Sequence, residues 1–280
     1  MPSVLRLASL ALVGGALLAL PRSGTAQDSD ERRERDAFTW SGSIPSGRWI
    51  YLRNLNGPVR VERGGSRVEV TAERRWSRDA DPRRVRFTST RAGDGQSQIV
   101  CALWDEDATC DEDGYHGSDR RDRWRDRDEG SVSVHFVVRV PEGVRVDVRT
   151  VNGGVEVRGA TAEVVARTTN GSVRAETLGG PVDARTTNGS IFASMRDVGD
   201  ARDLEFRTTN GSVVVEMPSS LGADVEMSTV NGRVNTEFPV TLSGRIDPRR
   251  LHARIGDGSR RLTMRTVNGS VELRRADGGR

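Results

Sequence analysis

The chain has 280 residues, of which 30% are charged, 35% are hydrophobic and only 5% are aromatic, a size that suits one or two modest domains. A formal net charge of +3 excludes the strongly basic surface of a nucleic-acid-binding protein. The longest apolar run, residues 7–20, is shorter than the ~20 residues that a membrane-spanning helix needs.

This apolar run has the features of a secretory signal peptide. Arg6 precedes it, and the small residues at 23–26 follow it, which is the arrangement that a signal peptidase recognises. We predict that residues 1–26 are cleaved, that a polar tail follows over residues 27–36, and that the mature protein is secreted or periplasmic without a transmembrane segment. A retained N-terminal anchor is the alternative.

Strands are predicted through the first half of the mature chain, because apolar and polar residues alternate there. The pattern is clearest in the segment that ends at Val140. We expect this half to consist of divergent coils of the repeat described below. The expected strands lie at residues 49–54, 59–62, 67–73, 84–89, 98–104 and 131–140.

A highly charged insertion, residues 105–130, interrupts these strands and is expected to be a solvated loop. Cys101 and Cys110 flank its start, and two cysteines so close together in an exported protein predict a local disulfide. Free thiols are the alternative. Acidic residues around the cysteines offer oxygen ligands for Ca²⁺, but their spacing does not match an EF-hand loop. A plain acidic loop without a metal is therefore the favoured interpretation.

Catalytic residues are not predicted. His116, His135 and His252 lack the spacing of metal ligands, and neither cysteine has a recognisable histidine partner for nucleophilic catalysis. We therefore expect neither a catalytic site nor a cofactor.

An internal repeat dominates the sequence: the dipeptide Asn-Gly occurs seven times. The residues four and six positions before each Asn, and three and five positions after it, are almost all apolar, so each unit predicts a strand, a corner and a second strand. Most units span 18–22 residues, whereas 37 residues separate the last two, which indicates a degenerate unit or a long insertion. The predicted corner residues are Asn56, Asn152, Asn170, Asn188, Asn210, Asn231 and Asn268.

Two architectures fit this unit, an antiparallel meander and a solenoid of parallel coils. A threonine two positions before the Asn recurs in every unit but the first. In a solenoid, equivalent residues stack ~4.8 Å apart, so inward threonines and the asparagines can form hydrogen-bonded ladders. We therefore favour a single all-β solenoid of Thr-x-Asn-Gly coils over residues 37–275, without helices, followed by a tail at 276–280. In the corners, Gly171 and Gly189 are expected to need a positive φ.

An arginine lies three positions before the Asn in almost every unit, and an acidic residue often lies two positions before that arginine. In a solenoid both sets form outward columns. Ion pairing that keeps the surface soluble is the favoured interpretation. The alternative is a wall that binds anions through guanidinium groups. The candidate ligand-binding residues are Arg149, Arg167, Arg185 and Arg207.

The units Thr-Val-Asn-Gly-Gly-Val at residues 150–155 and Thr-Thr-Asn-Gly-Ser-Val at residues 168–173 follow the segment Val-Pro-Glu-Gly-Val at 140–144. These segments resemble a bacterial β-strand repeat family of unknown function that is usually labelled "putative adhesin". The resemblance covers residues 45–275. It implies a β-repeat fold and, by analogy with surface solenoids, a binding role, but no catalytic residues.

The leading hypothesis is therefore an exported, non-enzymatic, adhesin-like binding or structural module of the cell envelope. Its partner would be an acidic glycan, another envelope component, or a protein that adds a strand. One alternative is a polysaccharide-active β-helix enzyme. The acidic residues of this sequence, however, recur in regular columns and form no isolated catalytic pair. Another is an accessory protein of envelope stress or signalling.

Overall fold

The computed structural model describes residues 37–77, 80–117, 131–200, 203–242 and 247–276, all within one compact unit, Asp36–Arg280. The predicted signal peptide, polar tail and most of the C-terminal tail lie outside the described residues, as does the second half of the charged insertion. The described residues form strands and one 3-10 turn, η1 (Pro82–Arg84). In this part of the chain, no helix is long and apolar enough to span a membrane.

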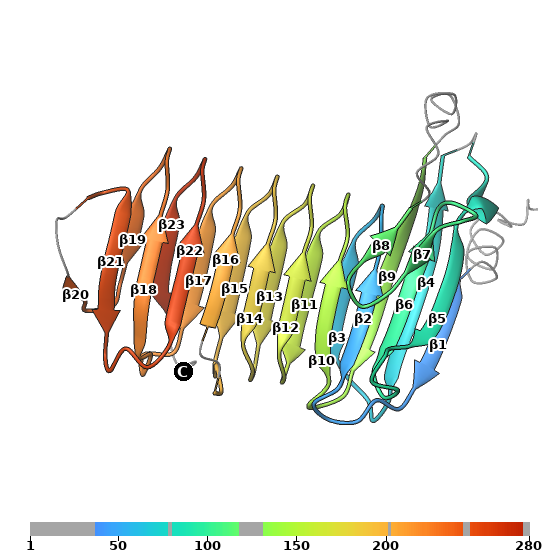
Figure 1. Ribbon diagram of the computed structural model, residues 1–280, viewed down its shortest axis with the longest axis horizontal. Helices are drawn as coiled ribbons and strands as arrows, with labels where there is room; N and C mark the ends of the chain where they lie inside the picture. Colours follow the sequence, from blue (N-terminus) through green and yellow to red (C-terminus); the bar gives the residue numbers. More distant parts are fainter. Residues whose placement is uncertain (1–36, 78–79, 118–130, 201–202, 243–246, 277–280) are drawn as a thin grey trace, which may run out of the picture. The chain divides into compact units, whose positions relative to one another are not determined.

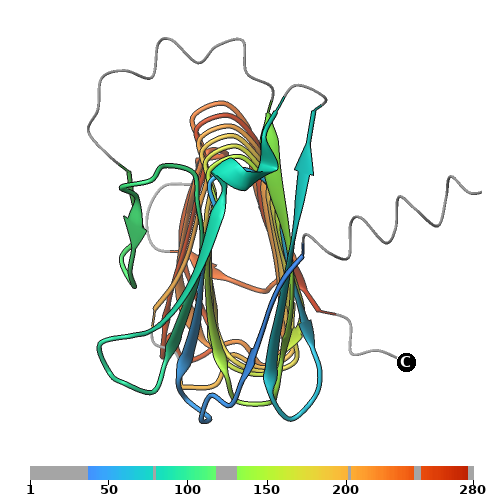
Figure 2. The same ribbon diagram turned by 90° about the vertical axis from the view of Figure 1, so that its right-hand side faces the viewer.

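Two large sheets face each other, and each coil contributes one strand to each sheet (Figures 1 and 2). The first sheet contains, in spatial order, β1 (Phe38–Gly42), β4 (Val68–Trp76), β9 (Val132–Val140), β3 (Val59–Arg63), β11 (Val155–Ala160), β13 (Val173–Thr177), β15 (Ile191–Met195), β17 (Val213–Met217), β23 (Val271–Arg275) and β19 (Val234–Thr236).

The second sheet contains, in spatial order, β20 (Thr241–Leu242), β21 (Arg250–Ile255), β18 (Ala223–Ser228), β22 (Arg261–Arg265), β16 (Asp203–Arg207), β14 (Val182–Arg185), β12 (Val164–Arg167), β10 (Arg145–Arg149), β2 (Trp49–Arg53), β6 (Gln98–Leu103) and β5 (Arg86–Arg91). A separate two-stranded hairpin pairs β7 (Thr109–Cys110) with β8 (Tyr115–His116).

The repeated units stack as parallel coils, which confirms the predicted solenoid. In the second sheet, Val146 of β10 lies opposite Ile50 of β2 on one side and Val164 of β12 on the other. These residues occupy the same position in their units and are fully buried. Because the side chains of a strand alternate between its faces, one face of each strand packs in the core between the sheets. The other face is free to carry polar side chains.

The stacking order departs from the chain order at the C-terminal end of the stack. β22 lies between β16 and β18, and β23 lies between β17 and β19. The coil of Asn268 is thus inserted between the coils of Asn210 and Asn231. The 37-residue separation contains a long insertion, in which β21 pairs antiparallel with β18 and covers this edge of the second sheet.

The N-terminal half differs from the predicted series of divergent coils. β6 and β9 continue the parallel stack beside the coil of Asn56, but β1, β4 and β5 pair antiparallel with their neighbours. An alternation of period two fits both strand directions, so it does not distinguish them. These antiparallel strands cover the end of the stack, where an open edge would otherwise invite pairing with another chain.

The asparagines at the corners form a ladder of side-chain amides. Asn188 donates from Nδ2 to Oδ1 of Asn170 at 2.7 Å and accepts from Nδ2 of Asn210 at 2.7 Å. The ladder runs from Asn152 through Asn210 and Asn268 to Asn231, so it follows the stacking order. Asn56 instead donates to the carbonyl of Val132.

The threonines two positions before each Asn are buried, but they bond differently from what the sequence indicates. Thr186 donates from its hydroxyl to the carbonyl of Gly171 in the neighbouring coil at 2.8 Å, and Thr208 does the same to Gly189. Their hydroxyls therefore hydrogen-bond each strand to the backbone of the corner in the neighbouring coil. The amide ladder is formed by the asparagines alone.

The expected positive φ at Gly171 and Gly189 is wrong. Neither residue has a φ in the left-handed region, unlike Gly211 at 146° and Gly269 at 147°. A Cβ on Gly171 would overlap the carbonyl group of Gly153 in the neighbouring coil. Close approach of two backbones, rather than the backbone dihedral angle, is therefore what requires glycine at these two corners.

Candidate functional site

The outward face of the second sheet carries an uninterrupted series of arginines, which we call the arginine column. The parallel register places Arg149 of β10 opposite Arg53 of β2 and Arg167 of β12. The same register continues to the inserted coil, where Arg207 lies opposite Arg265. In stacking order the arginine column consists of Arg53, Arg149, Arg167, Arg185, Arg207 and Arg265.

Most arginines of the column form ion pairs with the acidic residues beside them. Arg185 Nη2 lies 2.6 Å from Glu205 Oε2, and Arg207 Nη2 lies 2.7 Å from Glu205 Oε1. Arg149 contacts Asp147 at 3.2 Å. Three of the four candidate ligand-binding arginines are thus paired with acids. The pairs of Glu205 with Arg185 and Arg207 are partly exposed, and such pairs contribute only ~0–1 kcal/mol to stability, so an incoming anion can compete with them. Asp147, the partner of Arg149, is buried.

Arg167 is the exception among the four candidates. The position that holds an acid in the neighbouring units is occupied by Val165, and within the described residues no ion pair involves Arg167. Its Nε is buried and has no hydrogen-bond partner, and the same holds for Nε of Arg265. Nε of Arg185 is likewise buried without a partner. Unpaired buried donors are costly, and because these nitrogens are inaccessible, a ligand would contact the outer nitrogens of the guanidiniums instead.

A groove crosses the strands beside the column. One part, with a volume of about 840 Å³, is lined by Arg145, Glu163, Arg167 and Asp183 and reaches Leu204. A second part, of about 360 Å³, begins at Leu204 and follows the strands that carry the later arginines. The two parts share Asp203 and Leu204, so together they form one depression along the stacking direction. Its second part is lined by Glu205, Arg207, Glu226, Thr263 and Arg265.

Asp183 lies in this groove, and burial raises the pKa of its carboxyl group. The neighbouring guanidiniums of Arg185 and Arg167 act in the opposite direction. Its Oδ1 is buried without a hydrogen-bond partner and lies 3.6 Å from Nε of Arg185. This oxygen and Nε of Arg167 are therefore both unpaired polar atoms that lie beneath the surface of the groove.

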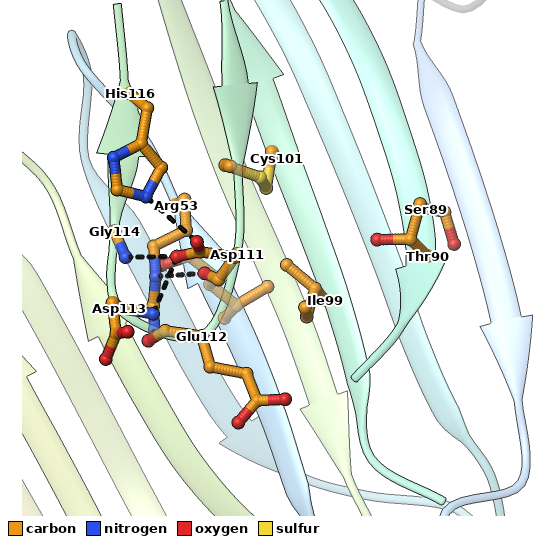
Figure 3. The surroundings of a disulfide bond; sticks show 12 residues. Arg53, Ser89, Thr90, Ile99, Cys101, Asp111, Glu112, Asp113, Gly114 and His116 are labelled. Carbon is orange, nitrogen blue, oxygen red and sulfur yellow. Dashed lines mark hydrogen bonds and ion pairs between the residues drawn. A yellow bond between two sulfur atoms is a disulfide. The ribbon is translucent and has the colours of Figure 1, made fainter. Parts of the chain in front are cut away.

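The first end of the column is covered by the hairpin β7–β8, which we call the disulfide hairpin (Figure 3). The predicted disulfide joins Cys101 of β6 to Cys110 of β7. The first part of the charged insertion is therefore a folded hairpin and not the solvated loop that its composition indicates. An Asp-Gly pair forms its turn. The disulfide and the packing around Tyr115 hold the hairpin against the sheet.

Backbone carbonyls of the disulfide hairpin dock on the arginine column. Arg53 donates from Nε to the carbonyl of Asp111 at 3.3 Å and from Nη2 to the carbonyl of Glu112. Arg149 donates to the carbonyl of Asp113. Arg53 is only 1% exposed and forms an ion pair with Asp147 at 2.7 Å. Burial lowers the pKa of the Arg53 guanidinium, and the negative charge of Asp147 acts in the opposite direction.

Sequence reasoning missed this hairpin, although a signal was present. Asp113-Gly114 is a turn dipeptide typical of hairpins, and it follows a cysteine that is expected to be bonded. Asp111 accepts hydrogen bonds from the backbone of Asp113 and Gly114 and contacts His116 at 3.0 Å. Its carboxylate therefore stabilises the turn itself. Among the described residues, no group of three or more metal-ligating side chains is close enough to hold an ion.

The fold and the repeat place the protein in a known class, the bacterial β-repeat proteins. A model of the Toastrack family, DUF4097, matches residues 121–274, and the chain belongs to this family. No protein of curated function matches the sequence.

Crystal structures to which the chain shows a weak likeness include one of a "putative cell adhesion protein" from Clostridium sporogenes, with 6% identity over 86% of this chain and 100% of that chain and a TM-score of 0.48. Another is a "putative adhesin" from Bacteroides fragilis, with 7% identity over 87% of this chain and 99% of that chain and a TM-score of 0.28. Likenesses this weak carry no information on function.

Proposed function

We propose that the protein is an exported, non-enzymatic binding module of the cell envelope, and that the arginine column holds an acidic glycan. The observation that carries the proposal is the unbroken series of guanidiniums on neighbouring strands, in which Arg167 has no ion-pair partner among the described residues. A guanidinium presents planar, two-pronged donors that match a carboxylate.

Repetition supports a polymer as the ligand. A single exposed contact between a guanidinium and a carboxylate is weak in water. A polymer that meets several arginines gains affinity, because after the first contact each further one forms at a high effective concentration. The groove beside the column runs in the same direction as the column, so it provides room for such a chain.

A binding role without catalysis is supported by how the acids of this face are used. Asp147 contacts both Arg53 and Arg149, and Glu205 contacts both Arg185 and Arg207. A glycosidase instead needs two carboxyl groups that act on the glycosidic bond, one of them as a proton donor. Acids that bridge successive arginines are suited to holding the guanidiniums in position.

Export is supported by the Cys101–Cys110 disulfide, because disulfides persist in oxidising compartments. Mass analysis of the protein purified from its native source tests this part of the proposal. We expect a mature chain that begins at or near Gln27 and carries the intact disulfide. Recovery of Met1, or of free thiols in unreduced protein, would contradict export.

Retention on immobilised polygalacturonate tests the binding site. The test variant replaces Arg149, Arg167, Arg185 and Arg207 by Gln. The matched control also removes four arginines, from the outward face of the first sheet, where their side chains are 44–56% exposed. The control variant replaces Arg60, Arg158, Arg174 and Arg274 by Gln.

We expect the parent and the control variant to be retained and the test variant to elute with proteins that do not bind. Retention should fall steeply with salt, because exposed charges are screened within ~8 Å at physiological ionic strength. An uncharged glucan should retain none of them. Failure of the parent to bind, or equal loss in both variants, would overturn the proposal.

A further inference from the structure

One end of the stack leaves an edge of each sheet without a neighbouring strand. At this end, β1 is the last strand of the first sheet and β5 is the last strand of the second (Figure 1). Both strands cover the parallel coils, but each of them still has one free side. A free side exposes unpaired N–H and C=O groups, which can pair with a strand of another chain.

The backbone groups on the free side of β5 follow from the hydrogen bonds beside it. Ala92 donates its N–H to the carbonyl of Ser97. Residues of an antiparallel strand bond alternately to its two sides, so the regular register directs the N–H and C=O groups of Phe87, Ser89 and Arg91 away from β6. Within the described residues, none of these backbone groups has a hydrogen-bond partner.

The same alternation identifies the free side of β1. Ser77 donates to the carbonyl of Ser131, so the odd-numbered residues of β4 bond to β9 and its even-numbered residues bond to β1. Thr39 and Ser41 lie opposite odd-numbered residues of β4, and their N–H and C=O groups therefore point to the free side. In the part of the chain that the structure describes, these groups too are unpaired.

Neither edge carries the features that protect free edges from association. Such features are charged side chains, proline, a bulge or a very short strand. β1 contains no charged residue, and β5 is charged only at its two ends, Arg86 and Arg91. The other end of the stack is protected, because β19 and β20 have only three and two residues. There, β21 also carries Arg250, His252 and Arg254.

Aromatic side chains lie between the two free edges. Phe38 of β1 stacks on Phe87 of β5, with the ring centroids 5.0 Å apart. These two rings and that of Trp40 pack on the end of the core and are only partly buried. Aromatic residues are enriched in protein interfaces. The end face thus combines unpaired backbone groups with the side chains that are typical of an interface.

The stacked rings also show how the two edges are aligned. The coils run in one direction in the second sheet and return in the first. β5 is antiparallel to the coils of its sheet, whereas two antiparallel pairings relate β1 to the coils of the other. β1 and β5 therefore run in the same direction. Because Phe38 lies against Phe87, the residues two positions further along, Trp40 and Ser89, lie at the same level.

We propose that this end of the stack binds the same end of a second copy of the chain. A two-fold axis perpendicular to both sheets, passing through Trp40 and Ser89, reverses the strand direction and the stacking direction together. One operation therefore sets β1 against β1 and β5 against β5, both in antiparallel pairing. The free backbone groups of both edges are then paired, and both sheets continue across the interface. A single added peptide strand would pair only one of the two edges.

The sequence of β5 is complementary to itself in this register. Pairing about Ser89 places Phe87 opposite Arg91 of the second copy, and Thr88 opposite Thr90 of the second copy. No like charges face each other, and cross-strand pairs of threonines stabilise antiparallel strands. The residues with free backbone groups thus all find partners without repulsion.

The dimer has a consequence for the arginine column, although the inference itself does not depend on glycan binding. An axis perpendicular to the sheets keeps the outward face of the second sheet on the same side in both copies. Both arginine columns therefore lie on one face of the dimer. A polymer long enough to contact both columns would bind with a higher effective concentration at the second.

Sedimentation velocity of the full chain with its disulfide intact, at micromolar concentrations, tests the dimer. We expect twice the mass of one chain. Ser89→Pro should reduce this to a single mass, because the lost N–H faces the free side and not β6, and proline is tolerated at such edge positions. The matched control is Thr236→Pro in β19, the edge strand at the other end of the first sheet, which should remain dimeric. Circular dichroism of both variants verifies the fold.

Cysteine pairing tests the register independently. The proposed axis places Thr39 opposite Ser41 of the second copy, with the Cα atoms ~5.5 Å apart, and a disulfide spans about 4.4–6.8 Å between Cα atoms. In either variant alone, the two new cysteines are diagonal neighbours ~7–8 Å apart. We expect an oxidised mixture of Thr39→Cys and Ser41→Cys to form the intermolecular disulfide, and neither variant to form it alone.

A parent protein that sediments as a single chain at these concentrations would overturn the proposal. A dimer that Ser89→Pro leaves intact, or that Thr236→Pro dissociates, would place the interface elsewhere and overturn it as well. A mixture without the disulfide, or equal cross-linking in either cysteine variant alone, would contradict the two-fold register.

Discussion

Arg207 and Arg265 lie directly opposite each other in β16 and β22, although the entire coil of Asn231 separates them in the chain. On its other side, Arg265 lies opposite Ser228 in the same register. The inserted coil carries the same corner as its neighbours, so the ladder of asparagine side chains continues through it. The consequence is functional, because insertion of the last coil extends the arginine column by one position.

The hydroxyl of Thr186 should contribute more to stability than that of its neighbour Thr187. Thr186→Val keeps the shape but leaves the carbonyl of Gly171 facing a methyl group, which costs ~1–3 kcal/mol for a buried polar group. Thr187 is exposed, so Thr187→Val should change the free energy of unfolding little. Urea unfolding of both variants measures the difference. Equal losses would show that the bond to the neighbouring corner is not stabilising.

Glycine at the corner should be required because the coils approach closely. If Gly171 were needed for a positive φ, Gly171→Asn would be tolerated better than Gly171→Ala, because asparagine adopts the left-handed region more readily. Since any Cβ there overlaps the backbone of Gly153, we expect both variants to be strongly destabilised. Gly47, with φ 79° and open space around it, is the control, and there Asn should be milder than Ala. A rescue by Asn at position 171 would contradict this explanation.

The coil itself could be predicted from the sequence. The apolar residues recur with a period of two, which indicates the buried positions, and the recurring Asn-Gly pairs indicate where the chain turns. The order of the coils could not be predicted, since the unit around Asn268 carries the same signals as the unit around Asn210 and nothing in either specifies its neighbour. The arginine column could be predicted as well, because its residues, like those of the core, recur at the same position in each unit. The cover over Arg53 could not, because it consists of backbone carbonyls, which leave no pattern in the residue types.

The disulfide should hold the disulfide hairpin against the column. Replacing Cys101 and Cys110 by Ser should lower the free energy of unfolding by about 2–3 kcal/mol, as expected for so short a closed loop. Amide exchange at Cys110 and Tyr115, which pair in the hairpin, should become faster at these positions. Reductant should destabilise the parent to the level of the double variant and leave the variant unchanged. An unaltered exchange rate would mean that packing alone holds the hairpin.

Asp94 should make stability fall in acid. Hydrogen bonds from the side chain and backbone of Ser97 and from the backbone of Gln96 lower the pKa of Asp94 to about 2, from an ordinary 3.8. Because the native state favours the charged form, the stabilisation is complete above pH 3.8 and is lost as the pH falls through about 2. Asp94→Asn should flatten this part of the unfolding profile. An identical acid profile for parent and variant would contradict the assignment.

Asp183 should have the opposite effect. Burial raises its pKa, so the native state favours the protonated form, and its contribution to stability is lost as the pH rises from 3.8 through the raised value. The free energy of unfolding of Asp183→Asn, taken relative to that of the parent, should therefore be higher at pH 7 than at pH 4. Unfolding free energies at the two pH values measure this. A variant that loses more stability at pH 7 would show that the ion pair with Arg185 outweighs burial.

The most direct measurement of the binding surface is the NMR signal of each arginine side chain in protein labelled with ¹⁵N-arginine. The Nε–Hε signals report on the guanidinium itself, on both sheets at once. On titration with tetragalacturonate, we expect the signals of Arg167, Arg185, Arg207 and Arg265 to shift together and to saturate, while those of Arg60, Arg158 and Arg174 stay in place. Shifts confined to the first sheet, or no shift of Arg167 at saturating ligand, would contradict the arginine column as the binding site.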